Sequence, residues 1–246
     1  MEEYTIRLSF SLAKITKIEK QAEKLLGQFE LPNVSFGFIE IENMSWRRLF
    51  DHALDEIHYS GSCQRVGRCM RLAIIENDNW IGGIVLGSTF PNILVRDEAL
   101  GLRQYIVDWR KRGLKSPWSR ENVAYWSNLQ KVVNHARTFI FPKYQGVGKG
   151  IHAHKLLLKD GINMWKKKYC DDVIGLDTLC THENSRLFKD NGWTLVGKTK
   201  GYTSDPSRVF SKRAFTKDWK AVRNNVALGR IKGSTCWYVW VRPIGS

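Results

Sequence analysis

The chain has 246 residues, 43% of them hydrophobic, which is enough to bury the core of one large domain. Its formal net charge of +15 favours a polyanionic partner, most simply nucleic acid. The five cysteines form no Cys-x-x-Cys pair and no apolar run could cross a bilayer, which excludes a zinc ribbon, a disulfide scaffold and a membrane-spanning protein. No basic segment followed by an apolar one opens the chain, so we expect a soluble, cytoplasmic protein.

The first part of the chain shows helical periodicity and then strand-like runs. From the spacing of the apolar residues we expect a helix at 12–29, a strand at 36–41, a helix at 46–57, and strands at 70–76 and 80–88. Polar turn formers between the last two strands predict a hairpin. The first helix lies ahead of the remaining elements. We therefore expect an N-terminal helical extension at 1–34 and one domain at 35–246.

The stretch 91–133 breaks this pattern and is predicted to be an insertion with helices of its own. Its interleaved basic and aromatic side chains suit a groove for distorted or single-stranded nucleic acid, bound by charge and by stacking. The alternative is a helical flap whose tryptophans pack onto the body of the protein. The candidate nucleic-acid-binding residues are Arg103, Trp109, Arg110, Arg112, Lys115, Trp118, Arg120 and Trp126.

The second half of the chain alternates between apolar runs and amphipathic segments. In order, we expect a strand at 137–141, a glycine turn, a helix that runs to about 169, a strand at 172–179, a short helix at 183–190, and strands at 193–198 and 237–241.

The glycine turn Gln145-Gly146-Val147-Gly148-Lys149-Gly150 is the most informative motif. It connects an apolar strand to a helix, which aims free backbone N–H groups and a helix N-terminus at a phosphate. Lys149 is not followed by Ser or Thr, as a Walker loop requires, and the glycine spacing is not that of a dinucleotide fingerprint. Taken alone, the turn is equally consistent with a tight strand-to-helix connection.

Two segments, 137–150 and 184–193, resemble the GNAT acyltransferase superfamily, and the order of elements is similar to that of the family from about 35 to 244. The resemblance implies an α/β fold with a mixed central sheet and helices on both faces. It also implies a site for acetyl-coenzyme A or a related acyl-coenzyme A. The cofactor-binding residues implied are Phe139, Ile140, Phe141, Gln145, Gly146, Val147, Gly148, Lys149, Gly150 and Asn184.

The usual acid and base of that family have no counterpart in the matching segments. Many members place a Glu base on the strand before the glycine turn, and 136–141 holds no carboxylate. Many use a Tyr on the short helix as the acid for the departing thiolate, and Phe188 stands at that position. The acid and base of an acyl transfer must therefore lie elsewhere in this chain.

A divergent branch of the family provides a second resemblance. The segment 58–61, the strand that contains Gly82, and Arg137 resemble features of phage Mom-type proteins, which place a carbamoylmethyl group on adenine N6 in DNA. The segment 132–142 also resembles an acetyltransferase-like family of antiphage defence loci. If this branch is the right one, the protein works in the cytoplasm of the host cell.

The candidate catalytic groups flank the expected core strands, and each has a structural alternative. His58 is a general base or a metal ligand, or else a capping residue. Tyr59 and Ser60 are hydroxyl acids or helix caps. Arg137 binds a phosphate or carboxylate, or forms a structural ion pair.

Two further candidates lie in the second half of the chain, together with two histidines that we leave out of the catalytic set. Asp177 is a base or a metal ligand together with His58, or else an edge or solvent-facing residue. Tyr202 is a replacement acid or a packing residue. His152 and His154 are two residues apart on a helix and do not share a face, so we interpret them as surface or cofactor-rim residues.

The sequence therefore predicts a GNAT-fold transferase that modifies nucleic acid, in its most specific form a Mom-like enzyme acting on DNA adenine. A flipped adenine would be stacked on aromatic side chains of the insertion. One alternative is a conventional N-acyltransferase for another amine, such as a hypermodified base, RNA or a polyamine. Another is a nucleic-acid-binding module without catalysis. A metal requirement and the oligomeric state are left open.

Overall fold

The computed structural model describes residues 14–21, 24, 35–58, 67–145, 148–169, 172–180, 185–199 and 237–244. Their centre is one seven-stranded sheet in the spatial order β1-β2-β3-β4-β5-β7-β6. Its β4 and β5 are parallel, and the other neighbours are antiparallel. The strands are β1 (Phe36–Glu40), β2 (Cys69–Glu76), β3 (Asn79–Ser88), β4 (Val132–Ile140), β5 (Gly175–Cys180), β6 (Thr194–Lys198) and β7 (Tyr238–Pro243).

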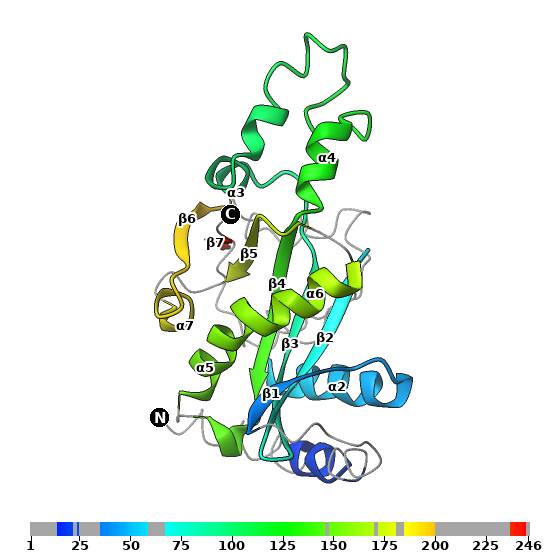
Figure 1. The fold of residues 1–246 in the computed structure, drawn as a ribbon, viewed down its shortest axis with the longest axis vertical. Helices are drawn as coiled ribbons and strands as arrows, with labels where there is room; N and C mark the ends of the chain where they lie inside the picture. The colour runs from blue at the N-terminus through cyan, green and yellow to red at the C-terminus, as the bar shows by residue number, and fades with distance from the viewer. Residues whose placement is uncertain are drawn as a thin grey trace, which may run out of the picture.

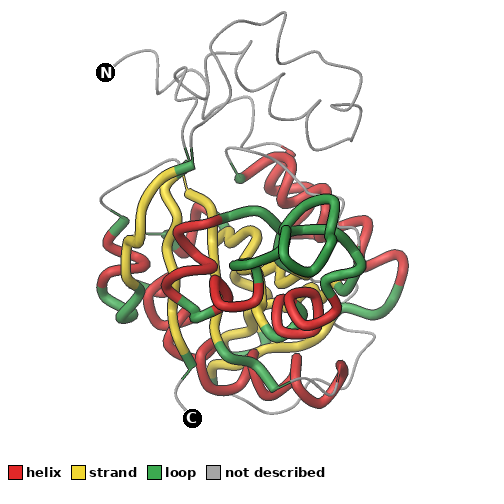
Figure 2. Tube along the Cα trace, turned by 90° about the horizontal axis from the view of Figure 1, so that it is seen from above, coloured by secondary structure: helices red, strands yellow, loops and turns green. Residues whose placement is uncertain are grey.

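The helices lie on both sides of this sheet (Figures 1 and 2). This arrangement and the order of elements confirm the α/β class and the succession of strands and helices expected from the sequence. The helices are α2 (Met44–Ile57), α3 (Leu94–Ala99), α4 (Val123–Leu129), α5 (Lys149–Leu156), α6 (Ile162–Tyr169) and α7 (Arg186–Lys189), with the 3-10 turns η1 (Leu102–Tyr105) and η2 (Pro142–Tyr144) and the π turn η3 (Leu157–Gly161).

The hairpin between β2 and β3 forms as predicted. Asn77 and Asp78 have φ of 47° and 61°, the left-handed conformation that a two-residue type I′ turn requires at both central positions. Asn tolerates this conformation better than most residues, and Asp shares that property. The hairpin places two apolar strands side by side at the centre of one half of the sheet.

Two separate apolar clusters cover the two faces of the sheet. On one face, α2 and the helix at 14–21 contribute Phe50 and Ile18. On the other, the continuous helical run from α5 through η3 to α6 contributes Leu157 and Trp165. This run confirms the predicted long helix after the glycine turn, with a π turn inside it. No helix in the described part of the chain is both long and apolar enough to cross a membrane.

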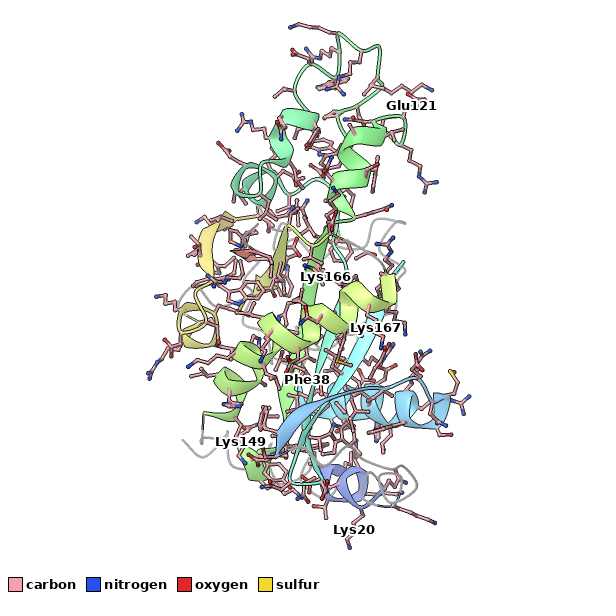
Figure 3. The ribbon with its side chains drawn as sticks, viewed as in Figure 1. Lys20, Phe38, Glu121, Lys149, Lys166 and Lys167 are labelled. Atoms are coloured by element: carbon pink, nitrogen blue, oxygen red, sulfur yellow. The ribbon has the colours of Figure 1, made fainter. Side chains whose placement is uncertain are left out.

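The predicted insertion projects from one end of the molecule (Figure 1). It consists of α3, η1, α4 and the loop between η1 and α4, and we call this segment, 94–129, the arm. The arm has a small core of its own that includes Leu102, Ile106 and Tyr125. Figure 3 shows Glu121 in the arm and Lys149, the first residue of α5, toward the other end of the molecule.

The predicted boundary between insertion and strand was wrong by five residues. β4 begins at Val132, whereas the sequence predicted a strand from Arg137. Asn134 and His135 interrupt the apolar pattern, which concealed the beginning of the strand. Both side chains are nevertheless buried, because other polar groups inside the protein bind them.

Candidate functional site

The two parallel strands at the centre of the sheet separate after a short contact. β4 pairs with β5 over three residues only, Val132–Asn134 against Gly175–Asp177. β4 itself continues to Ile140 and stays paired with β3 to that point. Along 135–140 the described part of the chain places no strand against the second edge of β4. Such an edge can bind the amide groups of a ligand in the way that it would bind a strand.

A bulge lies at the point of separation. Arg137 pairs with Val85 and His135 with Leu86, so Ala136 is an extra residue in β4. A bulge bends a strand and redirects the side chains around it. Ala136 accordingly belongs to the cluster under α2, while His135 contacts α5 on the other face.

The described ends of the glycine turn, Gln145 and Gly148, lie between η2, which follows β4, and α5. Gly148 is the N-cap and has φ of 69°, a left-handed conformation that glycine adopts without strain. No side chain of the described residues caps the N-terminus of α5, so its first N–H groups can bind a phosphate. Gly146 and Val147 lie outside the described residues. The described strand and the uncapped N-terminus of α5 suit the diphosphate of an acyl-coenzyme A.

A lysine stands at this helix N-terminus. Lys149 forms an ion pair with Glu76, and its Nζ lies 5.3 Å from the ring centroid of Tyr144. Lys143 lies over the same ring, with Nζ 4.9 Å from the centroid. Gln145 turns back and donates from Nε2 to the carbonyl oxygen of Ile140, at 2.7 Å. Lys149 is the first residue of α5 and directly follows the N-cap Gly148, so it is the basic residue next to the predicted phosphate site.

Three of the predicted cofactor residues belong to β4 and the residue after it. Phe139 and Phe141 are buried in the cluster under α2, where both contact Trp80, with ring centroids 6.1 and 4.9 Å away. Ile140 is partly buried on the opposite face. The two phenylalanine side chains are thus core residues, and the backbone of Phe141 is itself bonded, its N–H to the carbonyl oxygen of Ile81 and its carbonyl oxygen to the N–H of Tyr144. Asn184 lies outside the described residues.

The structure brings two of the predicted catalytic residues together. His58 is the C-cap of α2, and Arg137 lies on β4. Burial, and then the positive charge of Arg137, hold the pKa of His58 well below its usual value of 6.5. His58 is therefore neutral at pH 7, and the same two effects oppose its protonation. Tyr59, Ser60 and Tyr202 lie outside the described residues.

Asp177 lies at the centre of the sheet, which corrects the alternative of an edge or solvent-facing residue. Its side chain is fully buried on β5. Its Oδ2 lies 2.8 Å from Nη1 of Arg96, and its Oδ1 accepts from Nδ2 of Asn134 at 2.6 Å. Thr89 donates to the same carboxylate. These contacts favour a structural role over proton transfer or metal binding, which remain predictions.

The partner of Asp177 belongs to a larger buried network that anchors the arm. Arg96 on α3 also binds Asp97, with Nη2 and Oδ1 2.6 Å apart, and both side chains are fully buried. The hydroxyl of Tyr125 on α4 donates to the other oxygen of Asp97, at 3.1 Å. Burial, and then the charge of Asp97, raise the pKa of Tyr125 to about 12, so this hydroxyl keeps its proton. The network thus connects α3 and α4 with β5.

Two buried histidines, neither of them among our candidate site residues, lie where β4 and β5 separate. His135 on β4 and His154 on α5 have their Nε2 atoms 3.1 Å apart. Thr138 Oγ1 lies 2.6 Å from the same nitrogen of His135. The surface interpretation of His154 was wrong, since it is fully buried, whereas His152 is exposed. The two histidines of α5 do lie on different faces, as expected.

A helical spacing in the sequence does place His154 inside. His154, Leu157, Gly161 and Trp165 follow one another at intervals of three or four residues, and all four are buried. His135 carries no comparable signal, because the beginning of its strand was missed.

The tryptophans of the arm divide into two groups. Trp118 and Trp126 pack on the core of the arm, and Trp126 Nε1 donates to the carbonyl oxygen of Ser119 at 2.9 Å. Trp109 instead has the guanidinium of Arg110 5.1 Å from its ring centroid. These contacts favour the packing alternative for Trp118 and Trp126, which leaves Trp109 as the better stacking candidate.

The basic candidates of the arm are mostly exposed. Arg103 pairs with Glu98 at 2.7 Å, and Arg112 contacts Asn122 at 3.4 Å. Arg110, Lys115 and Arg120 are exposed or half-buried. Across the described residues no three His, Cys, Asp or Glu side chains are grouped so that they could hold a metal ion.

No protein-family model and no curated protein matches this sequence. Among solved structures, it is similar to a Bacillus subtilis acetyltransferase in complex with CoA, with 11% identity over 85% of this chain and 99% of that one and a TM-score of 0.41. An agmatine N-acetyltransferase shares 10% identity over 85% and 100% of the two chains, with a TM-score of 0.42. A mosquito arylalkylamine N-acetyltransferase like 5b shares 14% over 92% and 94%, with a TM-score of 0.38. At these values the likeness adds no argument about substrate or chemistry.

Proposed function

We propose that this protein is a GNAT-type N-acyltransferase that takes its acyl group from acyl-coenzyme A. The observation that carries the proposal is the junction of β4 and α5. A strand whose second edge is left open by β5 leads through a glycine turn into a helix whose N-terminus no described side chain caps. An open strand edge suits an amide-bearing chain, and a helix N-terminus suits a diphosphate. A coenzyme A molecule carries both groups.

Each residue of this junction has a defined role in the proposal. The N–H groups at the start of α5 and the ammonium of Lys149 bind the diphosphate, after Lys149 exchanges Glu76 for phosphate. The backbone of β4 beyond the bulge at Ala136 binds the amide groups of the donor. When bound, the donor supplies a thioester carbon for attack by an amine.

Coenzyme A is expected to raise the melting temperature, because it binds the folded state. At a concentration 100 times Kd the stabilisation is about 2.7 kcal/mol. Lys149→Ala removes one charged contact to phosphate, and we expect it to weaken binding at least about tenfold. Lys143→Ala is the matched control, since Lys143 lies over the same Tyr144 ring but outside α5.

Differential scanning fluorimetry and isothermal titration calorimetry test this prediction. If millimolar coenzyme A leaves the melting temperature unchanged while the protein still binds DNA, the chain is a binding module and not an acyltransferase. If both lysine variants bind coenzyme A with the same reduced affinity, the phosphate site is not at α5.

For the acceptor we propose an amine on nucleic acid, in the most specific form adenine N6 of DNA. The net charge of +15 and the exposed basic side chains of the arm support a polyanionic acceptor. Acyl transfer from a thioester leaves an acyl group on N6, so the product of this step is an amide; the carbamoylmethyl group of Mom-type proteins is attached through a CH2 carbon and does not follow from it. A hypermodified base, RNA and a polyamine are the competing acceptors, and each gives a different product.

The arm is expected to supply the salt-dependent part of DNA binding. Neutralising Arg110, Lys115 and Arg120 together should flatten the slope of log K against log salt concentration by about 0.9 for each phosphate that the variant no longer neutralises. Neutralising Lys155, Lys159 and Lys167 removes the same charge from α5, η3 and α6 and is the control. Fluorescence anisotropy with a labelled duplex measures both slopes, and equal slopes in the two variants would rule out the arm as the DNA-binding element.

Mass spectrometry of nucleosides identifies the acceptor. DNA and RNA from cells that express the protein should contain an adenosine derivative that is absent when Lys149→Ala is expressed. Unmodified adenine in both nucleic acids, together with acylation of spermidine in vitro, would establish the polyamine alternative.

A further inference from the structure

The contact between His135 and His154 links the two parts of the proposed site. Their Nε2 atoms are 3.1 Å apart and their ring centroids 4.7 Å apart, and both side chains are buried. His135 directly follows the last residue pair of β4 and β5. His154 lies one helical turn after Gly150 at the start of α5.

The hydrogen bonds determine which nitrogen carries the proton on each ring. His154 Nδ1 lies 2.9 Å from the carbonyl oxygen of Gly150, which can only accept, so this nitrogen carries a hydrogen. Burial lowers the pKa of His154 to about 4, so the ring is neutral at pH 7 and its Nε2 is an acceptor. His135 Nε2 must then be the donor of the contact. The basic nitrogen of His135 is therefore Nδ1.

His135 lies beside the residue that replaces the usual tyrosine acid. The ring centroid of Phe188 on α7 is 5.8 Å from that of His135, and the ring of Trp193 is 5.9 Å away. Thr138 on the same strand contacts His135 Nε2 at 2.6 Å. His154 is a titratable group in direct contact with His135. Phe188 cannot transfer a proton, whereas the imidazole next to it can.

We propose that His135 is the proton carrier of the acyl transfer and that His154 is its positioning residue. This inference rests on the proposed acyltransferase function. Nδ1 of His135 is buried in this structure, so the donor reaches it only after the open side of β4 and α5 move apart. The amine nitrogen then bonds to the thioester carbon and gives its proton to Nδ1 of His135. The carbon–sulfur bond breaks with its electron pair on sulfur, and the proton passes from Nδ1 to that sulfur, which yields an amide and a thiol.

Throughout this sequence the Nε2–H of His135 lies between two acceptors, Nε2 of His154 at 3.1 Å and Oγ1 of Thr138 at 2.6 Å. By accepting it, His154 keeps Nδ1 as the basic nitrogen and stabilises the ring while that ring is protonated. One imidazole thus performs both the base step and the acid step. Residues 136–141 contain no carboxylate that could act as the base, and Phe188 has no proton to donate as the acid.

Nitrogen-15 NMR of the histidine side chains tests the assignment without any substrate. We expect Nε2–H at His135 and Nδ1–H at His154 in the unliganded protein. His154→Phe should convert His135 to a mixture of tautomers, and His154→Gln, whose Oε1 can accept, should restore the Nε2–H form. His152→Gln is the matched control and should change neither signal. A proton on Nδ1 of His135 in the wild type would overturn the proposal.

Calorimetry with coenzyme A and desulfo-coenzyme A tests the contact with sulfur. At pH 7.5 the wild type and His152→Gln are expected to prefer coenzyme A by about tenfold, since only coenzyme A offers a thiol to Nδ1. His135→Gln should bind both compounds with equal affinity. If His135→Gln retains the preference, the proton carrier is another residue, while acyl-coenzyme A binding stands. If the wild type binds neither compound, the proposed function itself fails.

Discussion

Arg96→Met is expected to lower the free energy of unfolding by about 3–5 kcal/mol, the cost of removing one partner from a buried ion pair. The guanidinium is fully buried between the carboxylates of Asp97 and Asp177. Methionine fills a similar volume, so the decrease measures uncompensated charge and not a cavity. Urea unfolding followed by circular dichroism provides the measurement.

An exposed pair of the same chemistry is the control for this change. Arg103→Met breaks the ion pair with Glu98 on the surface of the arm and should cost no more than about 1 kcal/mol. The triple variant Arg96→Met, Asp97→Asn, Asp177→Asn should recover part of the stability, because no net charge stays buried. A destabilisation by Arg96→Met as small as that by Arg103→Met would show that the network is not an electrostatic anchor.

Gly82→Ala is expected to destabilise the protein by at least about 1–3 kcal/mol, the usual cost of overfilling a packed interior. A Cβ at Gly82 would lie 2.3 Å from the carbonyl oxygen of Phe139, so the pairing of β3 with β4 must shift. The same shift displaces the strand that leads into the glycine turn. Coenzyme A affinity should therefore decrease along with the melting temperature.

The neighbouring glycine provides the comparison, because its obstacle is a side chain. A Cβ at Gly83 would lie 2.3 Å from the ring of Phe50 and 2.7 Å from that of Phe139, so removing the Phe50 ring relieves the closer of two side-chain contacts. Gly83→Ala combined with Phe50→Leu should regain stability relative to Gly83→Ala alone, whereas Phe50→Leu should not help Gly82→Ala. If Phe50→Leu restores the stability of both glycine variants, the contact with the carbonyl oxygen of Phe139 is not the cause of the stability lost in Gly82→Ala.

Sequence patterns predicted the helices and the turn that are stabilised by interactions between residues close together in the chain. Helical spacing identified α2 and the run from α5 to α6, and turn chemistry identified the hairpin at Asn77. The position of β7 between β5 and β6 has no such signal, since it is decided by contacts between strands far apart in the sequence. The order of the strands in the sheet therefore cannot be predicted from the periodicity of apolar residues.

The candidate site shows the same division. Its glycine turn is a local motif, and the two described ends of the turn lie between η2 and α5. The roles of Asp177 and His154 depend on partners far away in the chain, Arg96 and His135. A polar residue in an apolar segment is ambiguous until such a partner is known. Trp118 is a further example, because its basic neighbours in the sequence suggested stacking, while its contacts are with the core of the arm.

The short contact between β4 and β5 divides the hydrogen-bond ladder of the sheet into two parts. Strands β1 to β4 form one part, and β5, β7 and β6 form the other. Three residue pairs of the ladder connect them. The last pair is Asn134 with Asp177, and the carboxylate of Asp177 is also bound by Arg96 of the arm. The arm therefore holds the two parts of the sheet together at the point where β4 and β5 separate. A load on its tip would be transmitted to the line along which the two halves of the sheet part.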